Sequence, residues 1–377
     1  MFGIQKISVI GRTYRHLNRY RQILAILLKY GFGDVIEMLK IDQYLELGLQ
    51  LVSGKERDPG EKLTRPQRIR MAFVELGPTY IKFGQMLSTR PDILPMEYVK
   101  ELEQLQDKVP ACSFPEIMEI VESELKTPCE TVFRNFEETP LASASIGQVH
   151  RAQLADGSPV AVKVQRPGIR KVIEVDLEIL LHMATLMERH IPEASLHRPV
   201  QIVEEFAACL EREVDYETEA GNMERMARLF ISDPTVVIPK VYREATTERV
   251  LTAEFVEGIK ISNIDALLAS GADPKILIER GATLYLTQIF EHGFFHADPH
   301  PGNIFALPEN VICLVDFGMV GRVDRHTRED FVELVDAVVR HNESRVVQIL
   351  LRLTLWETEP DIRALERDIA DFMGQHL

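Results

Sequence analysis

The spacing of acidic and amide residues in two short stretches constrains this chain most. In FFHADPHPGN (residues 294–303), Asp298 is followed five residues later by Asn303, and Asp316 of a DFG sequence follows Asn303 after thirteen more. Oxygen ligands of this kind hold Mg²⁺ beside phosphates, and a further carboxylate can orient an attacking group. DFG alone occurs often by chance, but the joint spacing does not. The pattern therefore predicts a site for a nucleotide and its metal ion.

The two histidines of the same stretch raise the alternative of a zinc site. His296 and His300 are four residues apart, which on a helix would place both on one face. Pro299 and Pro301 disfavour a regular helix here, so the zinc geometry is lost. We expect His296 to brace the loop and His300 to lie on the phosphate side.

A second pattern lies upstream, in the order found in protein kinases. ASASIGQV has the form A-x-A-x-x-G-x-V, a nucleotide loop with alanine in place of its first two glycines, and VAVK follows on a predicted strand. In kinases that lysine binds phosphates, while H-R-D-x-x-x-x-N and DFG supply the catalytic aspartate and two metal ligands. We assign Lys163 to phosphate, Asp298 to catalysis as the base, and Asn303 and Asp316 to metal. The residues expected at the nucleotide are Ala142, Ser143, Ala144, Ser145, Ile146, Gly147, Gln148, Val149 and Ala161.

Two further features fit this reading. TAEFVEG (residues 252–258) ends a predicted strand, where the carbonyl of Glu254 and the amide of Val256 would bond adenine behind the small gatekeeper Ala253. A carboxylate partner for Lys163 is expected on the helix EREVDYETEAGNMERM. The candidates on that helix are Glu213, Asp215 and Glu219.

The pattern of apolar residues, prolines and turn signals gives four segments. These are a basic amphipathic segment with a linker (1–60), a helical extension (61–130), a kinase-like N-lobe with inserted helices (131–256) and a helical C-lobe (257–377). Prolines predict helix starts near 66, 78 and 95. The fold class expected is α+β, with helices near 66–76, 78–89, 95–107, 114–126, 172–190 and 199–230, and strands near 145–154, 158–165, 249–256 and 310–318.

The charge is strongly acidic overall but not at the start of the chain. A net charge of −15 argues against nucleic acid as a partner. Residues 1–33 carry six basic residues and no carboxylate, which favours a helix lying on anionic lipid. The alternative is a basic helix packed on the protein's own acidic body. The apolar residues expected to face lipid are Ile7, Ile10, Leu17, Tyr20, Ile23, Leu24 and Leu28.

These motifs together resemble the UbiB family of atypical protein-kinase-like proteins, which includes the ADCK proteins. The residues that carry the resemblance are KFGQ (82–85), ASAS (142–145), EVD (213–215), HADPHPGN (296–303) and DFG (316–318). Ser143 departs from the more frequent A-A-A-S. The resemblance implies that Glu219 partners Lys163, and that Glu213 and Asp215 lie against the extension. That extension bears Lys82, Gly84 and Gln85 and covers the cleft.

The resemblance also implies a function. It is that of an ATP- or ADP-binding, Mg²⁺-dependent kinase or ATPase, with Mn²⁺ as an alternative ion, that supports ubiquinone or other isoprenoid-quinone biosynthesis. Its expected partners are membrane lipid, isoprenoid-quinone precursors and quinone-biosynthesis proteins, at the cytoplasmic surface of a membrane. Members usually continue to a C-terminal pair of membrane helices, so we expect this chain to be part of a longer one.

Two other functions stay open. A small-molecule kinase of the aminoglycoside or choline type has a similar H-x-D-x-H-P-x-N loop, although K-x-G-Q and VAVK argue against it. The other is a nucleotide-gated lipid-binding scaffold without turnover. Intact Lys163, Asp298, Asn303 and Asp316 argue against complete loss of the chemistry.

Overall fold

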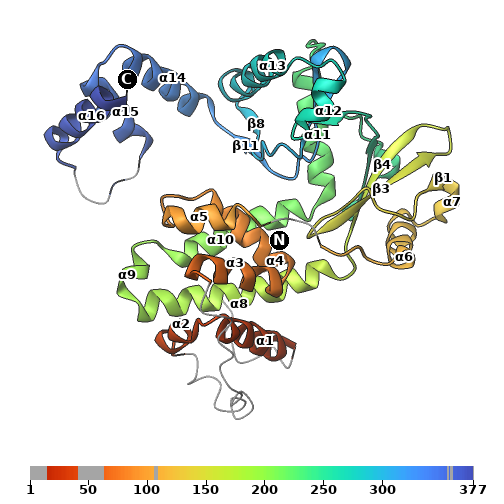
Figure 1. The fold of residues 1–377 in the computed structure, drawn as a ribbon, viewed down its shortest axis with the longest axis horizontal. Helices are drawn as coiled ribbons and strands as arrows, with labels where there is room; N and C mark the ends of the chain where they lie inside the picture. Colours follow the sequence, from red (N-terminus) through yellow and green to blue (C-terminus); the bar gives the residue numbers. More distant parts are fainter. Residues whose placement is uncertain (1–14, 41–62, 106–108, 355, 357–359, 377) are drawn as a thin grey trace. The chain divides into compact units, whose positions relative to one another are not determined.

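The computed structural model describes residues 15–40, 63–105, 109–354, 356 and 360–376 (Figure 1). These residues form two compact units, and each unit is built from two separate segments of the chain. The first unit contains the residues up to Ala220 together with Val241–Phe255, and the second contains Gly221–Lys240 together with Val256–Leu377. The first unit thus contains the predicted extension and the N-lobe sheet, and the second contains the whole of the predicted C-lobe.

The helices of the extension begin at the predicted prolines. In α3 (Arg65–Leu76) the side chain of Thr64 accepts a hydrogen bond from the Gln67 amide, and Pro66 lies in the first turn, where its missing N–H costs nothing. Pro78 opens α4 (Pro78–Ser88). The other helices of this unit are α1 (Arg15–Lys29), α2 (Gly33–Met38), α5 (Met96–Leu102), α6 (Phe114–Leu125), α7 (Cys129–Val132), α8 (Ile169–His190), α9 (Pro192–Ser195) and α10 (Pro199–Glu213), with the 3-10 turn η3 (Arg243–Ala245).

The predicted β-hairpin is the centre of an antiparallel sheet. Strand β3 (Gly147–Leu154) pairs with β4 (Pro159–Gln165) around a turn at Gly157, whose φ of 92° is a conformation that glycine adopts readily. Valines 160, 162 and 164 alternate into a core that α6 covers from one side (Figure 1). The sheet order is β1 (Phe133–Phe136), β3, β4, β6 (Val250–Glu254), with β2 (Ala142–Ser143) paired to β3.

One predicted helix is two helices in the structure. The expected helix near 199–230 breaks at Val214 and Asp215, so that α10 ends at Glu213 and α11 (Tyr216–Leu229) begins anew. The Asp215 carboxylate accepts hydrogen bonds from the Glu217 and Thr218 amides, at 3.0 and 3.4 Å, and so caps α11. Such a cap competes with helix continuation, and the E-x-D sequence is therefore a helix boundary. Residues of α11 up to Ala220 belong to the first unit and the rest to the second.

Short strands and three helices build the first part of the second unit. The sheet order is β5 (Val236–Val237), β10 (Val311–Leu314), β9 (Ile304–Leu307), β7 (Ile259–Lys260), with β5 and β10 parallel. Strands β8 (Phe294–His296) and β11 (Val320–Arg322) pair separately. The helices are α12 (Ile264–Ala269), α13 (Pro274–Leu286) and a π-helical turn η4 (Thr287–His292), with a 3-10 turn η5 (Pro308–Asn310).

The chain after DFG, within the predicted helical C-lobe, forms helices whose bounds were not predicted. They are α14 (Arg325–Val339), α15 (Glu343–Leu353) and α16 (Ile362–His376). Ala337, Val346, Ile349 and Met373 form a small core among them. Asp324 caps α14 and Asn342 caps α15 through their side chains, which are start signals visible in the sequence.

The described part of the basic N-terminal segment packs on the chain itself. In α1, Ile23 and Leu24 are buried, and the helix contacts α3 and α8 (Figure 1). Ile23 and Leu24 therefore pack on the protein's own body, which corrects the expectation that these two side chains face lipid. Tyr20 is half-buried, whereas Leu17 and Leu28 are exposed, and for these two the expectation stays a prediction. Ile7 and Ile10 lie outside the described residues. Within the described ranges, no helix is long and apolar enough to span a bilayer.

Candidate active site

Lys163 and Glu219 form an ion pair in the first unit, in which the carboxylate is buried and the lysine half-buried. Strand β4 carries Lys163, and its Nζ lies 2.9 and 3.0 Å from the two carboxylate oxygens of Glu219 on α11. Only 2 % of the Glu219 side chain is exposed, so the carboxylate would be strongly destabilised without this cation. The Lys163 ammonium also lies 5.1 Å from the ring centre of Tyr216. Of the three carboxylates left open by the helix sequence, the structure pairs Glu219 with Lys163.

The alanine-rich loop is short and tightly held. Ala142 and Ser143 pair with Val149 and Gln148 across β2 and β3, and the Ala144 amide donates to the Gly147 carbonyl at 2.8 Å. No residue from 142 to 147, all of them described, has a positive φ. The side chains of Ile146 and Gln148 are buried in the protein, so only their backbone could meet a ligand.

The expected hinge strand lies beside β4. Ala253 is the cross-strand neighbour of Ala161, which puts two small side chains in the row expected to face adenine. Beyond Glu254, the last residue of β6, the Phe255 amide donates to the Pro159 carbonyl at 3.1 Å. Val256 begins the next segment of the second unit.

The K-x-G-Q residues of α4 contact α10 and the end of the extension. Lys82 Nζ lies 2.6 Å from the Glu213 carboxylate, with less than a fifth of each side chain exposed. A Cβ on Gly84 would lie 2.3 Å from a Leu105 methyl carbon and 2.8 Å from the Phe73 ring, so only glycine fits. Gln85 donates to the Leu105 carbonyl at 3.2 Å. Asp215 caps α11 with both carboxylate oxygens, and its expected place against the extension stays a prediction.

In the second unit, the catalytic-loop residues are fixed by their neighbours. Asn303 Nδ2 donates to the Asp298 carboxylate at 3.0 Å, which orients that carboxylate. His296 is buried, and its Nε2 lies 3.1 Å from the Val315 carbonyl while Nδ1 accepts from the Asp298 amide at 3.3 Å. His296 also stacks edge-on against Phe317 of DFG. His300 Nδ1 accepts from the Gly302 amide, which stabilises the turn.

Two supporting residues were not predicted. Gln288 in the π-helical turn is fully buried and accepts the His296 amide at 2.8 Å. Asn222 on α11 donates to the Phe317 carbonyl at 3.1 Å. A polar residue within an apolar helix, as in LYLTQIF, was the only sequence signal for Gln288. Nearby, burial and the Asp298 charge raise the pKa of Tyr285 to about 12.

The metal-binding expectation can be tested against the donors present. Asp316 has a φ of 60°, and its carboxylate accepts a hydrogen bond from the Gly318 amide at 3.3 Å. The side-chain nitrogen of Asn303 bonds Asp298, so its amide oxygen can point to a metal ion. Carboxylate and amide oxygens are the donors that Mg²⁺ takes, usually with water and phosphate oxygens. The donor set therefore fits Mg²⁺. Within the described residues, no three His, Cys, Asp or Glu side chains are grouped to hold a metal.

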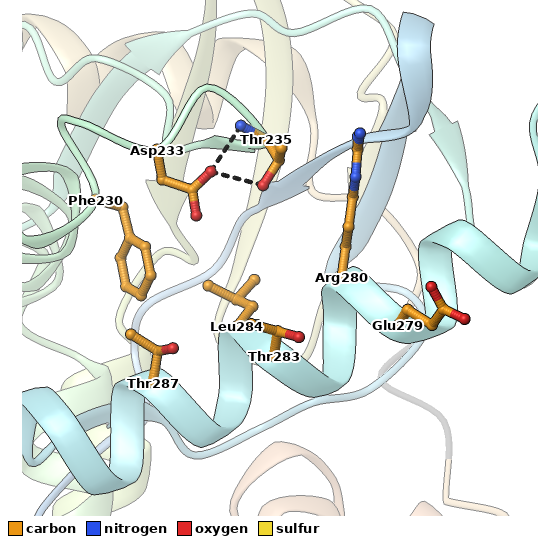
Figure 2. Close-up of a pocket in the computed structure, with 8 residues that line it drawn as sticks. All are labelled: Phe230, Asp233, Thr235, Glu279, Arg280, Thr283, Leu284 and Thr287. Carbon is orange, nitrogen blue, oxygen red and sulfur yellow. Dashed lines mark hydrogen bonds between the residues drawn. The ribbon is translucent and has the colours of Figure 1, made fainter.

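A separate hollow lies in the second unit. Figure 2 shows it between the end of α11 and α13, with Thr283, Leu284 and Thr287 below Asp233 and Thr235. Its volume is about 260 Å³. None of the predicted site residues lines it.

Comparison with known proteins identifies the family. Residues 104–350 match the ABC1 atypical kinase-like domain, which is more than half of the chain. This chain belongs to the ABC1 atypical kinase-like family. The resemblance to UbiB and ADCK proteins and the α+β kinase-like fold are thereby confirmed.

Relatives in this ABC1 family are similar over most of the chain. "Probable protein kinase UbiB" of Aeromonas salmonicida is 39 % identical, over 89 % of this chain and 62 % of its own length. "Protein ACTIVITY OF BC1 COMPLEX KINASE 7, chloroplastic" of Arabidopsis thaliana is 39 % identical, over 86 % of this chain and 46 % of its own length. The chain thus spans about half to two thirds of these relatives.

A solved structure is also similar to this chain over most of its length. The complex of Rv3197 with erythromycin from Mycobacterium tuberculosis has a TM-score of 0.55 and 26 % sequence identity, covering 80 % of this chain and 76 % of the other. The matched domain and the printed names of these relatives are those of kinase-like proteins.

Proposed function

We propose that this chain is a Mg²⁺-dependent, ATP-binding kinase or ATPase of the UbiB type that supports isoprenoid-quinone biosynthesis at a membrane. The ion pair between Lys163 and Glu219 carries the proposal. Protein kinases need this lysine and helix carboxylate together for phosphoryl transfer. A buried pair costs desolvation energy and could be replaced by apolar residues without loss of stability, so its presence supports a catalytic use.

The proposed nucleotide contacts come from several motifs. Lys163 would bind the α- and β-phosphates, and Glu219 would orient it. The loop from Ala142 to Val149 would cover the phosphates, while Ala161, Glu254 and Val256 would contact adenine. Asn303 and Asp316 would hold the metal ion, which when bound would neutralise phosphate charge.

Asp298 is the proposed base. Its carboxylate is oriented by Asn303, and its backbone amide is bonded to His296. A carboxylate so placed can accept a proton from an alcohol or a water molecule that attacks the terminal phosphate. Phosphate would then pass to that oxygen and ADP would leave.

The membrane role and the partners are part of the same proposal. Quinone precursors are long apolar molecules, so a protein that handles them works at a lipid surface. We propose peripheral association with the cytoplasmic face, contact with lipid and quinone precursors, and contact with quinone-biosynthesis proteins. The support for this is the UbiB-type relatives.

Nucleotide hydrolysis by wild type and Asp298→Asn, with and without membranes and quinone-precursor mimics, tests the proposal. We expect turnover in wild type, stimulation by the lipid and precursor, and a loss of about 100-fold or more in the variant, as for removal of a general base. Asp371→Asn on exposed α16 is the matched control. Equal turnover in wild type and Asp298→Asn would reject Asp298 as the base, and phosphorylation of a soluble alcohol would favour the small-molecule kinase.

Metal binding is tested separately by thermal shift. Asp316→Asn should largely remove the Mg²⁺-dependent stabilisation by nucleotide, because a charged ligand of the ion is lost. The nucleotide alone should still bind weakly. An unchanged Mg²⁺-dependent shift would exclude Asp316 from the metal site.

A further inference from the structure

Two arginines lie against one buried phenylalanine ring in the second unit. The guanidinium carbon of Arg225, on α11, lies 4.3 Å from the centre of the Phe294 ring, and that of Arg322, on β11, lies 5.8 Å from it. Phe294 and Arg322 are also direct neighbours across β8 and β11. The ring itself is fully buried. Two positive charges from separate elements are therefore held close together on an apolar surface.

Neither arginine has a partner that neutralises its charge. Within the part of the chain that the structure describes, Arg225 and Arg322 form no ion pair and no hydrogen bond. Their contacts with the ring leave the N–H groups at the edge of each guanidinium available. The Asp324 carboxylate, the nearest in sequence to Arg322, is occupied, since it accepts from the amide and the hydroxyl of Thr327, at 3.0 and 2.8 Å. The donors of both arginines can therefore serve a bound acceptor.

A shortage of carboxylates does not account for these unpaired arginines. The chain carries a net charge of −15. Arginines on the helix that follows β11 do pair with carboxylates, as Arg325 does with Glu329. Arg225 is half-buried, and donors that are largely removed from water usually have partners. Its unpaired position therefore points to an anion that is not part of the chain.

A third arginine adds positive charge next to the ring. Arg328, on α14, lies at Gly293, where an added Cβ would be 3.0 Å from its Nε. Its Nη1 donates to the carbonyls of Phe290 and Glu291, so the backbone fixes this arginine. Its Nε is buried without a hydrogen-bond partner among the described residues. The surroundings of Phe294 thus carry three arginines, from α11, β11 and α14.

A phosphate group matches this arrangement better than a carboxylate does. Each planar guanidinium can bind two oxygens at once. A carboxylate has two oxygens and a single charge, which suits one arginine. A phosphate monoester has three terminal oxygens and a charge of about −1.5 to −2 at neutral pH, which suits two. The apolar ring beside the arginines excludes water, and this strengthens the attraction between opposite charges.

We propose that Arg225 and Arg322 form a binding site for a phosphate monoester group, and that Arg328 adds to its positive field. None of these arginines belongs to the proposed nucleotide site. The phosphate group comes from a soluble compound or from a lipid head group, which offer the same oxygens. Asn222, one turn before Arg225 on α11, donates to the Phe317 carbonyl of DFG. A phosphate bound between α11 and β11 therefore restricts the movement of elements that hold DFG.

Calorimetric titration of the full chain tests the site. Inorganic phosphate and O-phosphoserine are the soluble probes, and phosphatidylcholine vesicles with and without phosphatidic acid are the lipid probes. Arg322→Gln, at an exposed position, should raise the Kd for phosphate-bearing probes by roughly tenfold or more, because charge-assisted hydrogen bonds are lost. Arg228→Gln is the matched control, since Arg228 is exposed on the same helix as Arg225, and it should leave the Kd unchanged.

A second variant keeps the charge on the ring. Arg225→Lys retains a cation but cannot bind two oxygens in parallel, so it should weaken binding by a smaller factor than Arg322→Gln. Binding of the soluble probes identifies a phosphate compound as the source, and binding of phosphatidic acid vesicles alone identifies lipid. The proposal is overturned if wild type binds no probe, or if wild type and Arg322→Gln bind every probe equally.

Hydrogen exchange locates the bound anion. The probe should slow amide exchange in β8 and β11 several-fold in wild type and not in Arg322→Gln, with β9 and β10 of the same unit as internal reference. Protection confined to β3 and β4 of the first unit would place the anion at the proposed nucleotide site and would reject the arginine site. None of these readouts requires nucleotide turnover, so the proposed function and this site can fail separately.

Discussion

At Gly147, the first residue of β3, a side chain has no space. An added Cβ would lie 2.3 Å from the Tyr216 hydroxyl and 2.7 Å from the Val164 carbonyl oxygen. Tyr216 is fully buried and the second neighbour is backbone, so neither can move cheaply. The glycine of the A-x-A-x-x-G-x-V pattern is therefore required here by packing and not by a positive φ.

We expect Gly147→Ala to lower the free energy of unfolding by about 1–3 kcal/mol, since overpacking forces neighbours to shift. Gly374→Ala is the control, because nothing lies within 4 Å of its added Cβ in α16. That change should be neutral or stabilise by up to about 1 kcal/mol through helix propensity. Urea unfolding measures both, and equal midpoints for the two variants would contradict the packing argument.

Some site residues could be predicted from the sequence, and others could not. Motif spacing predicted Lys163, Asp298, Asn303 and Asp316, because the chemistry expected of each position requires one residue type. The choice of Glu219 over Glu213 could not follow from spacing, since it depends on the break between α10 and α11. Asn222 acts through a contact with Phe317, far away in the chain, and Gln288 through a contact with the His296 amide in the next strand; no spacing rule marks such partners.

Among the elements, α11 depends on its first turn. Asp215 accepts the Glu217 and Thr218 amides and the Thr218 hydroxyl, and Glu219 lies directly after this turn. Loss of such a cap costs about 1 kcal/mol. We therefore expect Asp215→Ala to speed hydrogen exchange at the amides of residues 217 and 218, and to raise the KM for ATP.

Asp215→Asn should retain most of the cap, since asparagine caps nearly as well as aspartate. Wild-type exchange rates in Asp215→Ala would show that the cap does not hold this turn. The break itself was missed because the apolar pattern runs on from α10 into α11. Only the D-Y-E-T start, read as a cap, would have signalled it.

Helix α1 is held by one buried ion pair. Arg19 binds both carboxylate oxygens of Asp176, at 2.7 and 2.9 Å, and the Leu76 carbonyl. The Asp176 side chain is fully buried. Removing one partner of such a pair leaves an uncompensated charge, so Arg19→Ala should lower the free energy of unfolding by about 3–5 kcal/mol.

Lys29→Ala is the control on the same helix. Its pair with Glu75 is exposed, 55 % for the lysine side chain, and such solvent-screened pairs add little to the free energy of unfolding. Chemical denaturation of both variants compares them directly. Similar small losses would mean that α1 is not anchored through Arg19. The sequence predicted a basic amphipathic helix here. It could not show that the partner of Arg19 is Asp176, which lies on α8, far along the chain.

At the scale of the whole molecule, neither of the two units is one continuous segment of the chain. Strand β6 returns to the first unit after residues 221–240 have contributed to the second. The four consecutive segments expected from the sequence stay a prediction. Sequence signals such as linkers mark boundaries along the chain, but they cannot show that a later strand pairs with an earlier one. The pairing of β4 with β6 shows this exchange for the first unit, and the pairing of β5 with β10 shows it for the second.

A chain ending at residue 240 should therefore be less stable than one ending at 256. Without β6, strand β4 keeps an open edge, and the buried residues Val250 and Leu251 are missing from the sheet. We expect the shorter chain to aggregate and to lack a cooperative thermal transition, whereas the longer one unfolds at a higher temperature. Circular dichroism with light scattering compares them, and equal melting curves would argue that β6 is dispensable.

The separation of β4 from β6 also affects how the protein is made. β4 ends at Gln165, and its partner begins only at Val250. At ribosomal rates of about 5–20 residues per second, roughly 4–18 s pass before Glu254, the last residue of β6, has been synthesised. Throughout that interval, the edge of β4 that later pairs with β6 is open. A strand of another nascent chain could pair with that edge. Slow translation between codons 166 and 254 would therefore lower the soluble yield, and a chaperone that covers β4 would restore it.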